Sequence, residues 1–388
     1  MTARKLLTLG VAAVVVIAVA LWVANRTPAS HSEALGALLY PGLREEVNSV
    51  DAVRIHAAGD ARAVELRRAD EGWQIAHPED RAGYPADEAK IRRLLLALTQ
   101  ARLIEEKTSN PENYAALGVE DVSAADAGGV RVELGGTSTA FDLIVGKRGP
   151  GAKSTYVRRV NEPASWLIDA ALEADARPQN WLARDIVDLT ADRVQSAEIA
   201  AGKTPYTAAK ASRADADFKI EKLPRGKQLR SPSAANGLAT ALANLTLNDV
   251  RPAAELENEK PQARATFRTF DGLVAQLKGW EQDGKRLLAI SATFDEAQAQ
   301  RFHLPTAAPE SNAEERDAAE SESSSDNGAA GSAASGVPAS AQDDAPHSPE
   351  KVRAEVAALN ARAGAWVFEI PQYKYDAIFK PLEDMLED

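Results

Sequence analysis

Residues Arg68–Pro78 have the sequence RADEGWQIAHP, and a related stretch, RADADFKIEKLP, occupies Arg213–Pro224. Each copy places an aromatic residue five positions after its arginine, and an isoleucine two positions after the aromatic, as in Trp73 and Ile75. Alternation of apolar and polar residues is typical of a strand with one buried face. The repeat therefore predicts two related structural units, with Pro78 and Pro224 closing equivalent stretches.

The residues around the repeated stretch follow one scheme in both copies. Alternating apolar residues between Val50 and His77 predict three short strands, and Pro85-Ala86-Asp87 predicts the start of a helix. In the second copy, Phe218 and Ile220 take the places of the tryptophan and the isoleucine. The two predicted helices also share a spacing of apolar residues, with steps of 4, 3 and 5: Ile91, Leu95, Leu98 and Leu103 in the first, Leu238, Leu242, Leu245 and Val250 in the second.

The sequence thus predicts an α+β fold. It has two tandem related units after one N-terminal transmembrane helix, and each unit is an antiparallel strand meander plus a helix, followed by further strands. The expected division is 1–25 cytoplasmic stub and transmembrane anchor, 26–49 juxtamembrane linker, 50–168 first repeat, 169–192 helical connector, 193–304 and 350–388 second repeat, and 305–349 disordered acidic insertion. Further strands are expected at 130–134, 141–145, 155–160 and 165–168, the last as an edge strand, and at 264–269, 273–280, 286–291 and 366–370. Helices are expected at 351–361 and 374–386.

The charge of the chain is concentrated in one segment. The formal net charge is -12, but Thr306–Pro349 holds nine acidic residues and one arginine, so the remainder carries only -4. This segment has almost no large apolar residues, which predicts disorder because it cannot bury enough surface to offset its ordering entropy. The nearly neutral remainder argues against a nucleic-acid-binding surface. The chain has no cysteine, so disulfides, thiolate metal sites and an acylated lipoprotein cysteine are excluded.

The stretch from Leu6 to Val23 is apolar apart from Thr8 and Gly10 and follows Arg4 and Lys5. As a helix it would rise about 27 Å, close to the hydrocarbon thickness of a bilayer. The two basic residues predict a cytoplasmic N-terminus. We therefore expect a single-pass protein of the cell (inner) membrane, with the bulk of the chain periplasmic.

A cleaved signal peptide is the alternative interpretation of this stretch. Ala18-Val19-Ala20 has the small-x-small form that signal peptidase requires. The apolar run continues through Leu21, Trp22 and Val23, which favours an anchor. Both interpretations export the chain.

Several packing and turn motifs carry a resemblance to a known family. They are Trp-x-Ile-x-x-Pro at Trp73–Pro78, the following Pro-Ala-Asp helix start, Tyr114–Gly118, Ile144-Val145-Gly146 leading to Tyr156-Val157-Arg158, and Trp181-Leu182. With these motifs the chain resembles the uncharacterised bacterial family catalogued as domain of unknown function 4340. The resemblance implies a single-pass membrane protein that accompanies ABC transporters of the gliding-motility type. The acidic insertion departs from the family pattern.

No catalytic signature is found. The stretch Gly146–Ser154, GKRGPGAKS, lacks the contiguous Gly-Lys-Ser/Thr of a phosphate-binding loop and precedes β-type residues, which favours a hairpin tip. The five histidines are scattered, and no Gly-x-Ser-x-Gly elbow occurs. The sequence therefore predicts no catalytic residue, no cofactor and no metal.

Aromatic and basic residues leave two binding hypotheses open. The tryptophans could form a glycan-stacking surface, but alternation along predicted strands favours core packing. The basic run Lys222–Arg230 is typical of a solvated loop, with an anionic lipid surface as the alternative. The leading hypothesis is a non-enzymatic, membrane-anchored binding or scaffolding protein with ABC transporter subunits as partners. The alternative is an envelope enzyme or glycan-binding protein with a cleft between the two repeats.

Overall fold

The computed structural model of this chain describes residues 35–151, 153–302 and 348–387. Among these residues no helix is long and apolar enough to span a membrane. The predicted anchor, Leu6–Val23, lies outside the described residues, as does nearly all of the predicted acidic insertion. The fold of the described part is α+β, with two eight-stranded sheets whose recorded strand pairs are antiparallel.

The first sheet has the strand order β3-β2-β1-β5-β6-β7-β8-β4. Its strands span β1 Ala52–Ala57, β2 Ala61–Ala69, β3 Gly72–His77, β4 Leu103–Thr108, β5 Val130–Gly135, β6 Phe141–Arg148, β7 Thr155–Arg159 and β8 Ser165–Ile168. The predicted meander and the four later strands are confirmed. The strand expected at the edge, β8, is instead flanked by β7 and β4, because β4 adds outside it.

Cross-strand pairing explains why these sequences form one buried face. Val53 of β1 lies opposite Leu66 of β2 on one side and Leu134 of β5 on the other, and all three are buried. The next inward residue, Ile55, is enclosed in the same way. Alternation places Arg54 on the opposite face, where it pairs with Glu133 at 2.8 Å. The period-2 pattern therefore fixes the register of the meander.

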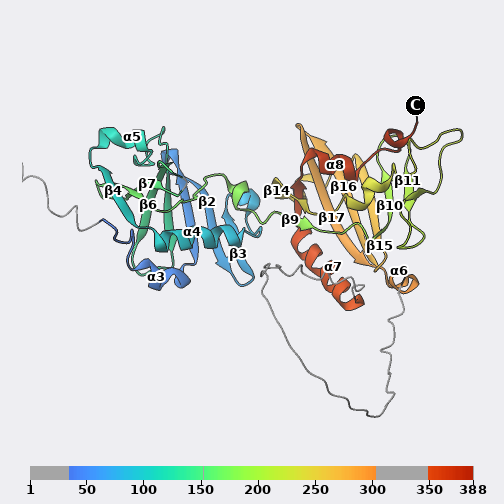
Figure 1. The fold of residues 1–388 in the computed structure, drawn as a ribbon, viewed down its shortest axis with the longest axis horizontal. Helices are drawn as coiled ribbons and strands as arrows, with labels where there is room; N and C mark the ends of the chain where they lie inside the picture. The colour runs from blue at the N-terminus through green and yellow to red at the C-terminus, as the bar shows by residue number, and fades with distance from the viewer. Residues whose placement is uncertain (1–34, 152, 303–347, 388) are drawn as a thin grey trace, which may run out of the picture. The chain divides into compact units, whose positions relative to one another are not determined.

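Helix α4 (Glu88–Gln100) covers the buried face of the first sheet (Figure 1). Asp87 caps it, because its carboxylate accepts the N–H of Lys90 at 2.9 Å. The buried residues follow the 3.6-residue period and are Ile91, Leu94, Leu95, Leu98 and Thr99. The predicted helix start and its apolar face are confirmed.

The opposite face of the first sheet is covered by α5 (Tyr114–Leu117) and the chain after it. Tyr114, Val119 and Ile144 form a buried cluster there. The buried guanidinium of Arg158 donates to the carbonyl of Val119 at 2.7 Å and lies over the Tyr114 ring at 4.7 Å. Two stretches that the sequence marked as motifs, around Tyr114 and Arg158, thus belong to one packing cluster.

Gly146 of β6 is required by the close approach of α5. A Cβ atom at this position would lie 2.4 Å from the carbonyl oxygen of Leu117. After Gly146 the chain turns back into β7, with Gly149 donating to the carbonyl of Ser154 at 3.0 Å. The expected hairpin tip is confirmed.

The second sheet repeats the strand order of the first, as β12-β11-β10-β15-β16-β17-β18-β14. Its strands span β10 Val194–Ala200, β11 Tyr206–Ala209, β12 Lys219–Ile220, β14 Asp249–Pro252, β15 Ala263–Thr269, β16 Leu273–Gln282, β17 Lys285–Phe294 and β18 Trp366–Glu369. Each strand occupies the place of its counterpart in chain order. Strand β12 lies where β3 lies, directly after Phe218, so the two repeated stretches are topologically equivalent.

The second repeat has no long helix where one was predicted. The residues from Asn236 to Thr240 form a single 3-10 turn, η6, and Leu245 already belongs to the short strand β13 (Leu245–Thr246), which pairs with β9 (Asp185–Val187). The side chain of Asn236 binds the backbone N–H of Phe218 at 3.0 Å, and Asn244 has φ 47°. The left-handed backbone at Asn244 is incompatible with one continuous right-handed helix through this stretch. Leu238 and Leu242 are nevertheless buried, as the shared spacing required.

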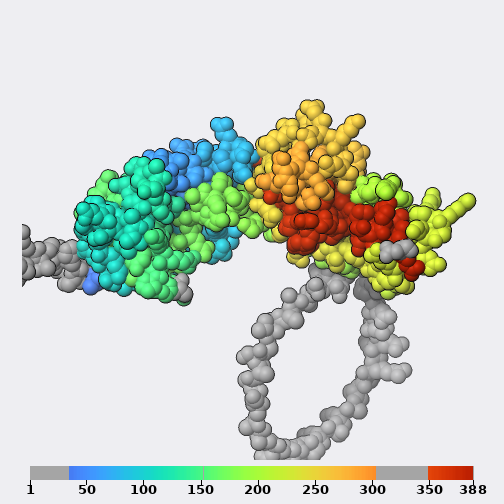
Figure 2. All heavy atoms as spheres, turned by 90° about the horizontal axis from the view of Figure 1, so that it is seen from above, coloured from blue at the N-terminus to red at the C-terminus, as the bar shows by residue number. Residues whose placement is uncertain are grey.

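Two C-terminal helices, α7 (Pro349–Ala363) and α8 (Gln372–Ile378), pack against the second sheet. α7 lies beside β17. Figure 2 shows red atoms of the C-terminal segment beside the orange atoms of the second sheet. Ser348 caps α7, so the predicted insertion ends earlier than position 349. The predicted terminal helix is broken into α8 (Gln372–Ile378) and η8 (Leu382–Met385), because Pro381 cannot continue it.

The connector between the repeats is not the helix that was expected. Its one helical turn is η5 (Pro178–Trp181), since Arg177 precedes proline and is extended. Upstream, Leu172 donates its N–H to the hydroxyl of Thr155 at 3.2 Å. The backbone is therefore satisfied by long-range partners instead of by helical hydrogen bonds.

The chain divides into two compact units. The first unit comprises the chain up to Asp185 together with two later segments, Thr246–Glu257 and Trp366–Glu369, which contain β14 and β18. The second contains Ile186–Leu245, Asn258–Ala365 and Ile370–Asp388. Within the first unit, Arg81 donates two hydrogen bonds to the carboxylate of Asp249, at 2.8 and 2.6 Å.

Candidate functional site

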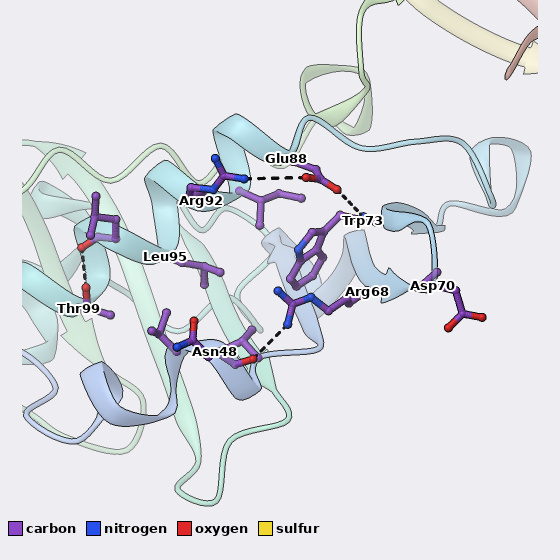
Figure 3. Close-up of a pocket in the computed structure, with 14 residues that line it drawn as sticks. Asn48, Arg68, Asp70, Trp73, Glu88, Arg92, Leu95 and Thr99 are labelled. Carbon is purple, nitrogen blue, oxygen red and sulfur yellow. Dashed lines mark hydrogen bonds and ion pairs between the residues drawn. The ribbon is translucent and has the colours of Figure 1, made fainter. Parts of the chain in front are cut away.

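An open groove of about 660 Å³ in the first unit is the candidate binding site (Figure 3). Its volume is typical of ligand pockets. One wall is a stripe of α4, made by Glu88, Ile91, Arg92, Leu95, Leu96 and Thr99. The other wall comes from the turn η1 (Val47–Ser49), from Val50, and from the end of β2 and the start of β3.

The floor of the groove is apolar. Trp73, Ile91 and Leu95 contribute side chains that are almost wholly buried. Leu96 stands on the rim with 53% of its surface exposed, on the side of α4 that otherwise carries charged residues. An exposed leucine beside an apolar floor provides a surface on which an apolar group can be buried.

Trp73 is held in place from both sides. Its backbone N–H donates to Oε1 of Glu88 at 3.2 Å, which joins β3 to the first turn of α4. The guanidinium of Arg68 lies 5.8 Å from the centre of the indole ring. Gly72, with φ 113°, permits this arrangement, because a Cβ atom there would lie 2.3 Å from Glu88 Oε1.

Two arginines supply the polar character of the groove. Arg68 donates from Nη1 to the carbonyl of Asn48 at 3.1 Å, and Arg92 lies 4.0 Å from Glu88 Oε2. A guanidinium carries five N–H donors in a fixed fork, which suits carboxylates. Figure 3 shows Asp70 pointing away from Trp73 and Arg68, so its carboxylate does not face these donors.

The structural-motif residues named from the sequence lie in separate places, and Trp73 is the one that lines this groove. Ile75 lies on β3 with its side chain buried, and Pro78 follows that strand. Tyr156 lies on β7, on the cluster of Tyr114 and Val119. In the second repeat, Phe218 is buried, whereas Ile220 and Pro224 are half-buried.

Trp181 is a buried packing residue beside the start of α4. Its indole N–H donates to the carbonyl of Asp175 at 2.7 Å. Nζ of Lys90 lies 4.5 Å from the centre of its ring and donates to the carbonyl of Asn180 at 2.9 Å. Burial lowers the pKa of the Lys90 amine. These contacts hold Trp181 beside the first turn of α4.

The tryptophans do not form a joint surface in the described part of the chain. Trp73, Trp166, Trp181 and Trp280 are buried, and Trp366 is half-buried. Core packing therefore accounts for them better than a glycan-stacking platform does. Among the described residues, no group of three or more acidic or histidine side chains is placed to hold a metal ion.

Sequence reasoning singled out Trp73 but missed Arg68, Arg92 and Leu96 as parts of one groove. The signal that could have found them is Leu96, which follows Glu88 and Arg92 at intervals of four residues on the polar side of α4. An apolar residue at that position breaks the amphipathic pattern.

One family was found in comparisons with known proteins. The family model of Domain of unknown function (DUF4340) matches residues 73–264, from β3 of the first sheet to β15 of the second. Neither the curated proteins nor the solved structures gave a significant match. Through residues 73–264, this chain therefore belongs to the family described as Domain of unknown function (DUF4340).

Proposed function

We propose that this protein is a membrane-anchored, extracytoplasmic binding or scaffolding component, auxiliary to an ABC-type transport system of the gliding-motility type. The observation that carries the proposal is the open groove at Trp73. Glu88 lines this groove, and its carboxylate accepts the backbone N–H of Trp73. A partner would meet the guanidinium groups of Arg68 and Arg92 on the two walls of the groove and the apolar floor between the walls. Such a surface is suited to recognition.

The architecture supports a scaffolding role. We infer that the two sheets are copies of one unit, because their eight strands follow the same order. We further propose that the apolar stretch Leu6–Val23 is a single transmembrane helix that places both units on the periplasmic side. A duplicated unit behind one anchor offers two related surfaces near the membrane. The transport association rests on the family resemblance.

Purification of the tagged full chain from detergent-solubilised membranes tests this proposal. Quantitative mass spectrometry should recover ABC transporter subunits above a tagged, unrelated single-pass protein. Recovery at the level of that control would contradict the transport role. Specific retention of the chain on a peptidoglycan matrix, without such subunits, would favour the glycan-binding alternative instead.

A further inference from the structure

The residues of α4 that line the groove lie on one face of the helix, as the residues of a helix that pack against a second helix do. Glu88, Arg92, Leu96 and Thr99 follow at intervals of 4, 4 and 3 residues, while α4 turns its remaining apolar residues to the sheet. From Glu88 to Thr99 the stripe extends about 16 Å, or three helical turns. The groove is therefore long enough for a short partner helix.

The charges of the groove decide what such a helix would carry. Arg92 has 78% of its side chain exposed, and its recorded ion pair with Glu88 is a distant one of 4.0 Å. The guanidinium of Arg68 uses one of its donors on the Asn48 carbonyl. Each arginine thus retains N–H groups that a carboxylate can engage.

Two acidic residues, Glu88 and Asp70, also line the groove. Glu88 accepts the N–H of Trp73, and Asp70 points away from the indole (Figure 3). The apolar floor of Trp73, Ile91 and Leu95 lies between the two walls, and the exposed Leu96 lies one turn of α4 beyond Arg92. The groove thus presents cations on both walls around an apolar centre.

We propose that this groove binds a short amphipathic helix of a partner protein, with acidic residues bordering an apolar stripe. This inference rests on the proposed binding function and names its ligand class. The partner's carboxylates pair with Arg68 and Arg92, and an apolar side chain contacts the exposed Leu96. Helix-in-groove recognition of this kind uses anchors at helical spacing.

The test is fluorescence anisotropy with the full chain in nanodiscs and a labelled 14-residue peptide. The probe has leucine at i, i+3, i+4 and i+7 and glutamate beside them. Matched peptides replace every glutamate by glutamine or by lysine. The chain variants are Arg68→Glu/Arg92→Glu, the milder Arg68→Gln/Arg92→Gln, and Leu96→Glu. The control variant, Arg225→Glu/Lys227→Glu, changes the same number of charges on an exposed loop of the second unit.

The acidic peptide should bind, and its affinity should fall about tenfold for each guanidinium lost. The control variant should bind normally, and Arg68→Glu/Arg92→Glu should now prefer the lysine peptide. Equal binding of the glutamate and glutamine peptides would overturn the proposal, as would equal losses in the groove and control variants. Unchanged melting of Leu96→Glu shows that its loss of binding is local.

Affinity purification distinguishes a failure of the groove proposal from a failure of the proposed function. If transporter subunits still copurify with Arg68→Glu/Arg92→Glu as they do with the natural chain, the groove proposal fails while the proposed function stands. Arginine-dependent binding to phosphatidylglycerol vesicles without peptide binding would also overturn the groove proposal, in favour of a lipid surface.

Discussion

Trp73 and Glu88, fifteen residues apart, are joined by a hydrogen bond of 3.2 Å from the backbone N–H of Trp73 to the carboxylate of Glu88. The bond ties the strand that carries the repeated stretch to the first turn of α4. It fixes the indole at the floor of the groove, beside the half-exposed carboxylate of Glu88. One residue pair thus joins the fold of the first unit to the groove at Trp73.

Trp73→Ala should destabilise the first unit. The side chain is 8% exposed, and its removal leaves a cavity that costs about 3–5 kcal/mol of unfolding free energy. Trp73→Phe should cost much less, because Phe218 fills the equivalent place in the second repeat. Urea unfolding followed by circular dichroism measures both. An alanine variant as stable as the natural chain would refute the core assignment of Trp73.

The ion pairs of the buried Arg193 predict that substitutions of its partners destabilise the protein more the more deeply the partner is buried. Its Nε donates to Asp271 at 2.8 Å, and its two terminal nitrogens donate to Glu355 of α7 at 3.0 and 2.8 Å. The Asp271 side chain is 3% exposed. Asp271→Ala should lower the unfolding free energy by about 3–5 kcal/mol, because it leaves the buried guanidinium of Arg193 without its enclosed partner. Glu355→Ala, at a more exposed position, should cost about 1–3 kcal/mol.

The exposed pair of Glu296 and Arg353 is the control for this series. Glu296→Ala should change the unfolding free energy by less than about 0.5 kcal/mol, since both side chains are at least half exposed. Urea titrations of the three variants give the comparison. Equal losses for Asp271→Ala and Glu296→Ala would show that burial of the Arg193 pair contributes nothing.

Asp175 predicts a loss of stability in acid. The guanidinium of Arg177, bound at 2.7 and 3.0 Å, holds the pKa of the Asp175 carboxyl well below its usual range. The unfolded chain therefore binds the proton more tightly, so this contribution is present above about pH 4 and is lost as pH falls below it.

The variant Asp175→Asn isolates this contribution. It should be less stable than the natural chain at pH 6, and the difference should shrink towards pH 2.5. Glu173→Gln, at a neighbouring exposed carboxylate, is the matched control. Urea midpoints measured across this pH range provide the test, and a difference that stays constant with pH would contradict the assignment.

The apolar stretch Leu6–Val23 predicts how the chain is held at the membrane. The full chain should remain in the membrane pellet after carbonate extraction, and Edman sequencing should find the N-terminus uncleaved. Replacing Val15 and Val16 by arginine should disfavour insertion by about 2.5–3.5 kcal/mol per residue and release the chain from the pellet. A mature N-terminus at Leu21 would instead identify a cleaved signal peptide.

Strand patterns in the sequence predicted most of the two sheets. Alternation around Val53 and Ile55 marks β1. The Asp283-Gly284 pair, a dipeptide typical of hairpins, forms the turn between β16 and β17 with φ of 50° and 75°. These are local signals, in which neighbouring residues determine the structure. The two sheets have the same strand order. The strand patterns of the two repeats also follow one another in the same order along the chain.

Long-range contacts account for what the sequence could not predict. The expected second helix gives way to η6 and β13, because Leu245 and Thr246 pair with the distant strand β9. The groove depends on Arg68 of β2 and Arg92 of α4 lining the same hollow. Neither arrangement follows from periodicity, because each is decided by partners distant along the chain.

The central claim is that this protein recognises a partner of a membrane transport complex through the groove at Trp73. The most direct measurement is quantitative affinity purification of the tagged full chain, compared with Arg68→Glu/Arg92→Glu and with the control Arg225→Glu/Lys227→Glu. ABC transporter subunits should copurify with the natural chain and the control and be depleted about tenfold or more with the groove variant. Recovery of no transporter subunit with the natural chain, under conditions in which it remains folded, would contradict the account.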